Sequence, residues 1–303
     1  MKRTILDLVR ERPVLLDGGL GSELIARGLP QGACPEVWNT ERPETVKAIH
    51  ASYYEAGSDA VSTNSFGGSR IKLAAYGLEA RAAELNAAAA RIAREAAPAG
   101  RFVGGSIGPT GKFLKPQGEL AEAELEDAFA EQARALARGG ADFLIVETQY
   151  DLREALAALR AARSAASALP VFVSLTFNAY PRGYFTLMGN GVAAVVEALE
   201  KEGASAVGAN CTLDSREFVG LVAAFRQATR LPVIAQANAG RPVLGTDGEV
   251  VYSQSLEDYV GFIPAIIEAG ANVVGGCCGT RPEHVRKMSE LIHKGNIGKR
   301  RDL

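Results

Sequence analysis

The chain has 303 residues, of which 47% are hydrophobic and 22% charged, with a formal net charge of −2. This charge balance excludes the strongly basic surface that nucleic acids or anionic membranes attract. No stretch reaches the roughly 18 apolar residues of a membrane span, and the N-terminus lacks the apolar core and cleavage site of a signal peptide. We therefore expect a cytoplasmic globular protein without a nucleic-acid or membrane partner.

Eight short apolar runs alternate with amphipathic segments along the chain. The predicted strands are 14–17, 60–64, 102–107, 143–148, 171–177, 206–211, 233–238 and 273–277. The predicted helices between them are 43–55, 79–96, 120–138, 152–167, 192–201, 215–228 and 256–269. The runs show no clean polar and apolar alternation, which is typical of parallel strands buried on both faces. Gly57, Gly140 and Gly270 precede strands and are expected to cap the preceding helices.

Eight β/α units in one chain without a low-complexity break predict an α/β fold, a single (β/α)8 TIM barrel over residues 1–303. An open doubly wound sheet is the alternative, because strand counts from periodicity are uncertain. Residues 294–303 are rich in Lys, Arg and Gly and are expected to form a frayed tail.

Polar residues gather at the predicted C-terminal strand ends, where the chemistry of a (β/α)8 barrel is located. These residues are Asp17, Asn64, Ser106, Glu147, Asn178, Asn210, Cys211, Asn238, Cys277 and Cys278. We therefore expect one polar mouth with three thiols in it.

The cysteines indicate a metal site. Adjacent side chains of a strand point to opposite faces, so Cys277 and Cys278 can reach one target only if the backbone curls, which their flanking glycines permit. With Cys211 they would supply three thiolates and leave a fourth position open, as in catalytic zinc sites. Taken singly, each could instead be a small buried side chain, which is also the expected role of the loop residue Cys34.

A zinc ion with three thiolate ligands carries net negative charge. Such a centre is a weak Lewis acid toward water, yet it holds an incoming thiol as thiolate near neutral pH. The predicted ligand set therefore favours alkylation of sulfur.

Five segments carry a family resemblance that extends over nearly the whole chain. They are Asp17 to Leu24, Thr63 to Phe66, Ser106 to Lys112, Gly208 to Cys211, and Gly275 to Thr280 with the sequence Gly-Gly-Cys-Cys-Gly-Thr. Together they resemble the zinc-dependent homocysteine S-methyltransferase family, and most of all the homocysteine-binding module of cobalamin-dependent methionine synthase.

This resemblance implies a (β/α)8 barrel in which Cys211, Cys277 and Cys278 hold Zn2+ as the catalytic centre. The metal would bind the thiolate of homocysteine, which attacks a donor methyl group. The resemblance also places Asp17 and Glu147 near the amino-acid end of homocysteine. It identifies Asn238 with an asparagine that can occupy the metal when substrate is absent.

Each of these substrate-binding roles has an alternative. Asp17 could cap the short helix expected after it. Glu147 would be an unfavourable charge at a buried strand end without a partner, which a substrate ammonium would supply. Asn238 could satisfy backbone groups of its loop.

The methyl donor implied by the closest resemblance is a methylcorrinoid, which a separate corrinoid protein would have to bring. S-methylmethionine and S-adenosylmethionine are alternatives. Betaine is disfavoured because Thr148 stands where the betaine enzymes have a tyrosine after the strand glutamate. Another thiol or selenohomocysteine could replace homocysteine as acceptor. A non-catalytic zinc or thiol sensor is a further alternative, but it gives no purpose to the polar ring of Asp17, Asn64, Glu147 and Asn178.

Overall fold

The computed structural model describes residues 3–244 and 250–294 and contains one eight-stranded parallel sheet in the order β1-β12-β9-β8-β5-β4-β3-β2. The strands are β1 (Val14–Leu15), β2 (Ala60–Ser62), β3 (Phe102–Ile107), β4 (Phe143–Gln149), β5 (Val171–Leu175), β8 (Ala206–Asp214), β9 (Val233–Asn238) and β12 (Val273–Gly276). The Asp59 amide bridges the two edge strands by donating to the carbonyl oxygen of Leu15 at 2.7 Å. The sheet is therefore a nearly closed barrel, as predicted.

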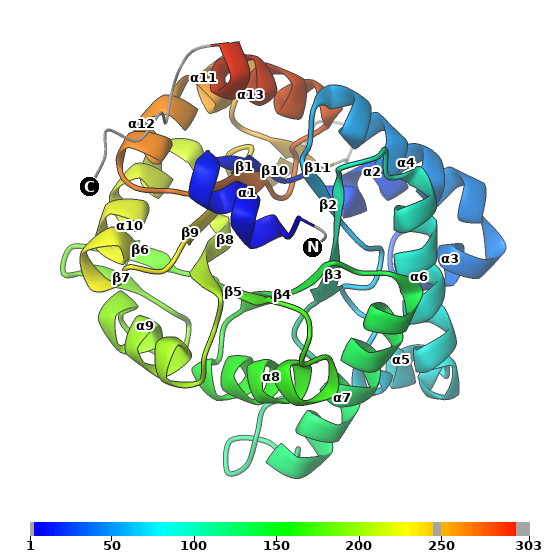
Figure 1. The fold of residues 1–303 in the computed structure, drawn as a ribbon. Coiled ribbons are helices and arrows are strands. Elements are labelled where there is room, and N and C mark those ends of the chain that lie inside the picture. The colour runs from blue at the N-terminus through cyan, green and yellow to red at the C-terminus, as the bar shows by residue number, and fades with distance from the viewer. Residues whose placement is uncertain (1–2, 245–249, 295–303) are drawn as a thin grey trace.

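Helices surround the barrel in chain order (Figure 1). They are α1 (Ile5–Glu11), α2 (Leu20–Ala26), α3 (Trp38–Glu41), α4 (Pro43–Ala56), α5 (Arg70–Leu73), α6 (Ala82–Ala96), α7 (Glu122–Gly139), α8 (Leu152–Ala165), α9 (Val192–Lys201), α10 (Ser215–Ala228), α11 (Leu256–Gly261), α12 (Ile263–Glu268) and α13 (Pro282–Lys294). Short 3-10 helices occupy Pro35–Val37, Ala74–Tyr76 and Glu79–Arg81. The described helices include none that is long and apolar enough to cross a membrane.

All seven predicted helices are present, with two differences. The segment 256–269 forms two helices, because Pro264 in the first turn of α12 cannot donate a backbone hydrogen bond. The segment 79–96 begins with a 3-10 turn before α6. Gly57, Gly140 and Gly270 have φ values of 113°, 106° and 118°, so each ends its helix in the left-handed conformation that was expected.

Several elements are absent from the sequence predictions, among them the short helices α3 and α5. Helices α1 and α13 begin and end the described chain, and the expected tail after Lys294 lies outside the described residues. Two antiparallel hairpins follow barrel strands: β6 (Asn178–Tyr180) with β7 (Gly183–Phe185), and β10 (Pro242–Leu244) with β11 (Val250–Tyr252). Both hairpins extend the same end of the barrel, because each follows the C-terminus of a parallel strand.

Apolar side chains fill the barrel interior near the N-terminal ends of the strands. They are Val14, Leu16, Ala60, Phe102, Phe143, Ile145, Phe172, Ala206, Ile234 and Val273 from the strands, with Ile5, Leu8 and Val9 from α1. Because strand side chains alternate between faces, residues two positions further along also point inward. Those positions include Ser62, Glu147, Ser174 and Gln236, so the interior changes from apolar to polar toward the C-terminal end.

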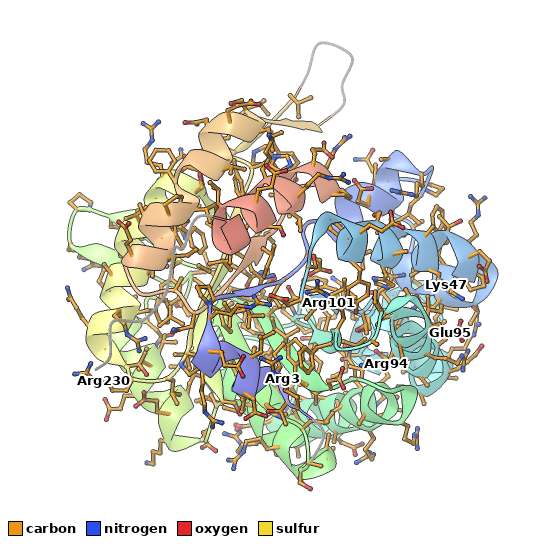
Figure 2. All side chains as sticks on the ribbon, turned by 45° about the horizontal axis from the view of Figure 1, so that its top comes forward. Arg3, Lys47, Arg94, Glu95, Arg101 and Arg230 are labelled. Atoms are coloured by element: carbon orange, nitrogen blue, oxygen red, sulfur yellow. The ribbon has the colours of Figure 1, made fainter. Side chains whose placement is uncertain are left out.

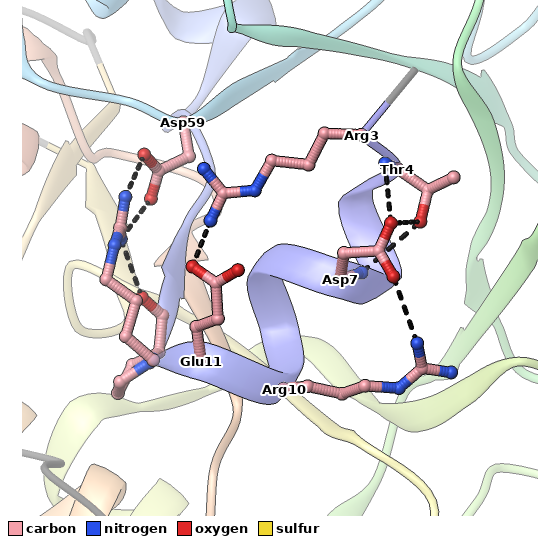
Figure 3. A network of polar contacts seen from close by, with 8 residues as sticks. Arg3, Thr4, Asp7, Arg10, Glu11 and Asp59 are labelled. Atoms are coloured by element: carbon pink, nitrogen blue, oxygen red, sulfur yellow. Dashed lines mark hydrogen bonds and ion pairs between the residues drawn. The ribbon is translucent and has the colours of Figure 1, made fainter. Parts of the chain in front are cut away.

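Helix α1 covers the opening of the barrel at the N-terminal ends of the strands, as Figure 1 shows. The Thr4 side chain caps this helix, and Asp7 completes the capping box (Figure 3). Beside it, Arg12 forms two hydrogen bonds of 2.7 Å to buried Asp59, which also accepts one from Arg101. These contacts close the N-terminal end with structural ion pairs and leave the C-terminal end for a site.

The outer surface of the helices carries ion pairs between neighbouring helices. Lys47 on α4 and Glu95 on α6, for example, meet at 3.1 Å (Figure 2). Exposed pairs of this kind contribute little stability and suggest a solvated face.

Candidate active site with a three-cysteine cluster

The three expected thiols meet at the C-terminal mouth of the barrel. The Sγ atoms of Cys211, Cys277 and Cys278 all lie within 4.8 Å of one another, and those of Cys211 and Cys278 are 3.9 Å apart. A tetrahedral zinc ion with Zn–S bonds of about 2.3 Å needs sulfur atoms about 3.8 Å apart. The cluster therefore fits a bound zinc ion and could hold a metal.

Unusual backbone geometry directs Cys211 to this point. Thr148, Cys211 and Thr212 have φ values of 60°, 63° and 64°, and no other non-glycine residue in the described chain has a positive φ. Such conformations are costly and persist where the surroundings hold them. The register of β8 shifts between Asn210 and Asp214, so the backbone leaves regular β geometry at the thiol.

Asn210 ties this irregular backbone to its neighbours. Its Oδ1 accepts hydrogen bonds from the Thr148 amide at 2.7 Å and the Ser174 hydroxyl at 2.8 Å. Its Nδ2 donates to Thr148 Oγ1 at 2.7 Å and points toward Cys277 Sγ at 3.7 Å. Asn210 thus links β4, β5 and β8 to a sulfur atom of the cluster.

The turn after β12 brings the adjacent cysteines to one side. Thr280 donates from its hydroxyl to the Cys277 carbonyl oxygen at 2.7 Å, and Asn238 Oδ1 accepts from the Cys278 amide at 3.1 Å. A Cβ at Gly276 would lie 2.1 Å from Thr280 Oγ1, so only glycine fits this curl. The expectation that glycines allow both thiols to face one target is consistent with this geometry.

The thiols influence one another's ionisation strongly. Hydrogen bonds from Cys277 and Cys278 stabilise the Cys211 thiolate and lower the pKa of Cys211. The hydrogen bond to Cys211 in turn raises the pKa of Cys277. Three neighbouring thiols cannot all ionise by themselves, so a cation among them would offset the repulsion between thiolates.

A cavity of about 420 Å³ opens beside the thiols. Its polar lining includes Asp17, Ser62, Ser106, Glu147, Lys72 and Gln236, and its apolar lining includes Leu20, Leu24, Phe66 and Tyr76. A space of this size accommodates a small molecule.

Three carboxyl groups line this cavity, and that of Glu36 accepts from the Gly67 amide at 2.6 Å and from the Cys34 thiol at 3.1 Å. The other two belong to Asp17 and Glu147. Asp17 is buried, and its oxygens accept from the Ser62 amide at 2.8 Å and the Ser62 hydroxyl at 3.2 Å. Burial raises the pKa of Asp17 to about 8, and the nearby charge of Glu147 adds to this effect. Desolvation likewise raises the pKa of Glu147 to about 7, although the Ser106 hydroxyl donates to it at 2.5 Å. A cationic ligand would stabilise the ionised form of both groups.

The alternative that Asp17 caps a helix is wrong. The N-cap of α2 is Gly19, and no side chain accepts a hydrogen bond there. Asp17 instead contacts Ser62 on the neighbouring strand β2. Asn238 is 4% exposed and bonded to the Cys278 amide, so its position agrees with its alternative role in satisfying a loop backbone group.

Other members of the expected polar ring take structural positions. Asn64 lines the cavity, but its Nδ2 donates to the Pro35 carbonyl oxygen at 2.8 Å and to Asn39 Oδ1 at 3.0 Å, which fixes a loop. Asn178 belongs to the β6–β7 hairpin and does not line the cavity. Cys34 donates to Glu36 at 3.1 Å and lies outside the sulfur cluster.

Two residues near the thiols escape the sequence analysis. Gln236 lines the cavity from β9, and the only local signal for it is its spacing of two from Ile234 and Asn238. Tyr252 on β11 packs its ring against Gly279, where an added Cβ would lie 2.3 Å from the ring. Its hydroxyl is hydrogen-bonded to Cys278. Tyr252 has no local signal, because the hairpin alone brings it to the thiols.

Exposed apolar side chains surround the mouth. Each large hydrophobic residue that is exposed in the described chain belongs to a segment that follows a barrel strand and precedes the next large helix. These residues are Ile25, Phe66, Tyr76, Phe113, Tyr180, Leu187, Met188, Val243 and Val251, and we call them the apolar rim. All of them therefore belong to connections at the C-terminal end of the strands, the end at which the cavity lies.

Comparisons with known proteins identify relatives of this chain. The chain is 34% identical to methionine synthase of Mycobacterium tuberculosis over 309 residues and 33% identical to that of Mycobacterium leprae over 312 residues. These matches cover 95% and 97% of the chain, which spans about a quarter of the length of both relatives.

The structure also resembles the metallated form of the homocysteine methyltransferase MmuM from Escherichia coli. The TM-score is 0.74 at 25% identity, over 93% of this chain and 97% of that chain. A family model described as homocysteine S-methyltransferase matches residues 14–292. The chain therefore belongs to the homocysteine S-methyltransferase family of enzymes.

Proposed function

We propose that this protein transfers a methyl group to the thiol of homocysteine, forming methionine at a Zn2+ centre held by Cys211, Cys277 and Cys278. The observation that carries the proposal is the sulfur cluster with a 3.9 Å Cys211–Cys278 separation, which opens into a cavity lined by Asp17 and Glu147. The relatives named above support the choice of homocysteine as acceptor.

Asp17 and Glu147 would bind the ammonium group of homocysteine. Both line the cavity, and the raised pKa of each reflects a carboxyl group that burial deprives of solvent. A bound ammonium would stabilise their ionised forms and orient the thiol toward the sulfur cluster. A zinc ion, when bound, lowers the pKa of the substrate thiol and keeps it a nucleophilic thiolate.

The donor that we favour is a methylcorrinoid delivered by a separate protein or module. The apolar rim supports this donor, because a docking partner needs an apolar surface around the mouth that a small diffusing donor does not need. The higher sequence identity to the two mycobacterial methionine synthases points the same way. We infer that such a partner would present its methyl group above the cavity.

A second candidate is a self-sufficient enzyme that uses a sulfonium donor such as S-methylmethionine. The observation in its favour is the match to 97% of the E. coli homocysteine methyltransferase chain, a protein of the same fold and extent. The 420 Å³ cavity has space for a small donor in addition to the acceptor thiol.

A donor panel separates these functions. Zinc-loaded protein would be combined with homocysteine and methylcobalamin, S-methylmethionine, S-adenosylmethionine or betaine, and methionine formation followed. Methylcobalamin alone should support turnover, and Cys277→Ala should abolish it. Cys34→Ala is the matched control, because Cys34 is a buried cysteine outside the sulfur cluster and should leave turnover unchanged.

The other outcomes have distinct meanings. Turnover with a sulfonium alone would replace the corrinoid donor with the second candidate. If no donor works and homocysteine leaves the spectrum of the cobalt-substituted site unchanged, the acceptor assignment fails and a thiol sensor becomes the better interpretation.

A further inference from the structure

Gln236 points into the cavity from the middle of the sheet. It lies on β9 two residues after Ile234, which packs in the apolar interior, so the alternation of the strand directs it inward. Its side chain is 3% exposed and lines the cavity together with Asp17 and Glu147. Gln236 therefore belongs to the polar layer above the apolar interior.

The amide oxygen of Gln236 has an unsatisfied hydrogen-bonding capacity. Within residues 3–244 and 250–294, its Oε1 is buried without a hydrogen-bond partner, and no other cavity-lining residue has a buried side-chain atom of this kind. A buried acceptor without a donor is unfavourable. A ligand in the cavity that carries a donor would remove this cost.

The neighbouring strand leaves space for this side chain. A Cβ on Gly275 would lie 3.3 Å from Gln236 Cγ, 3.0 Å from the Asp17 carbonyl oxygen and 2.9 Å from Leu16 Cβ. Glycine at this position lets Gln236 pack against the end of β1. The Gln236 side chain therefore lines the same cavity as Asp17.

We propose that Gln236 accepts a hydrogen bond from the ammonium group of the amino-acid substrate, as a third acceptor beside Asp17 and Glu147. An ammonium carries three donors, and the two carboxyl groups and one amide oxygen match that number. This inference rests on the proposed function and deepens it, because it makes Gln236 a determinant of selectivity for thiols that carry an amino group. A thiol without that group would leave the Gln236 oxygen without a donor and the two buried carboxyl groups without a cation.

Binding of three thiols to the zinc-loaded Gln236→Met variant tests this contact. Methionine is similar in length to glutamine but lacks the acceptor. Homocysteine has both an amino and a carboxylate group, 4-sulfanylbutanoate lacks the amino group, and 3-aminopropane-1-thiol lacks the carboxylate. By calorimetric titration, we expect about a tenfold higher Kd for homocysteine and 3-aminopropane-1-thiol, and an unchanged Kd for 4-sulfanylbutanoate.

Gln132→Met is the matched control. Gln132 on α7 also has a buried Oε1 without a partner in the described chain, but it does not line the cavity. This variant should leave the ratio of the three dissociation constants as in the wild type. The thermal stability of Gln132→Met would show how much a buried glutamine contributes to the stability of the fold when it makes no contact with a ligand.

Several results would overturn the inference. An equal loss of affinity for all three thiols would make Gln236 a purely structural residue. A loss confined to homocysteine and 4-sulfanylbutanoate, the two ligands with a carboxylate, would assign the Gln236 amide to the carboxylate end of the substrate. If the wild type binds homocysteine and Gln236→Met has the same three dissociation constants, the contact is rejected and the proposed function stays intact. Wild-type protein that binds none of the thiols would reject the proposed function and this inference together.

Discussion

The Sγ atoms of Cys211 and Cys278 approach to 3.9 Å although the residues are 67 positions apart and lie at the ends of strands β8 and β12, which β9 separates in the sheet. The two thiols meet because parallel strands end at the same edge of the barrel. The sulfur cluster is therefore a product of the closed barrel, and no local segment contains all three thiols.

Asn210→Ala should weaken zinc binding without removing a ligand. The asparagine bonds to Thr148 and Ser174 and holds the backbone that carries Cys211. We expect a loss of about 10- to 100-fold in zinc affinity, as for other residues that support ligands. The unpaired Thr148 amide should also lower the free energy of unfolding by about 1–3 kcal/mol.

Competition with a chelator and urea denaturation measure these two effects. Asn178→Ala is the control, because Asn178 lies in the β6–β7 hairpin away from the cavity. Wild-type zinc affinity in Asn210→Ala would show that the cluster forms without this support.

Asp17→Asn should change how stability depends on pH. Burial raises the pKa of Asp17 from 3.8 to about 8, so the folded protein holds a proton that the unfolded chain releases. The contribution of Asp17 is therefore present below about pH 4 and is lost as the pH rises toward 8. The asparagine cannot ionise, so the variant should gain stability relative to the wild type over this interval.

Denaturation of both proteins without homocysteine at pH 5, 7 and 9 tests this expectation. The difference between the two proteins isolates Asp17 from other titrating groups. A difference that stays constant with pH would mean that Asp17 is already ionised in the folded protein.

The kcat/KM for homocysteine should rise with pH from 6 and level off above about 8. Binding of the substrate ammonium needs ionised Asp17 and Glu147, whose pKa values are raised by burial to about 8 and about 7. Glu147→Gln should lower kcat/KM at pH 8 by about 10- to 100-fold, because it removes one charge from this contact.

The substrate analogue 4-sulfanylbutanoate is the control for this profile, since it has no ammonium. Its kcat/KM should be much less sensitive to Glu147→Gln. Equal sensitivity of both substrates would place Glu147 elsewhere than at the amino group.

Leu187→Ser should weaken docking of a corrinoid protein. Leu187 is 64% exposed, the most of any residue in the apolar rim. If a partner docks there, its KM should increase by about tenfold, while the KM for homocysteine and the turnover with free methylcobalamin remain unchanged.

Arg230→Ser is the comparison for the opposite end of the barrel. Arg230 lies in the connection that precedes β9, at the end that α1 covers (Figure 2). Equal effects of the two substitutions, or none from Leu187→Ser, would exclude the rim as the docking surface.

Much of the barrel can be predicted from the sequence, because its signals are local. Apolar runs identify all eight strands, and strands β3 and β9 have the predicted bounds. Positive φ at Gly57 and Gly140 agrees with the expected helix ends. The convergence of Cys211, Cys277 and Cys278 also follows, since the ends of parallel strands share one edge.

The partners of each polar side chain depend on the tertiary structure. Asp17 and Asn64 both follow strands and both line the cavity, yet Asp17 accepts from Ser62 on the next strand while Asn64 Nδ2 donates to a loop carbonyl oxygen. Tyr252 reaches Cys278 only because a hairpin folds over the mouth.

The sequence by itself thus determines which strands form and where their polar ends lie, because apolar patterning and glycine conformations act over a few residues. Only the tertiary structure decides which side chains meet. The place of Gln236 in the cavity lining depends on strand register and on the space that Gly275 leaves, which involve residues far apart in the chain.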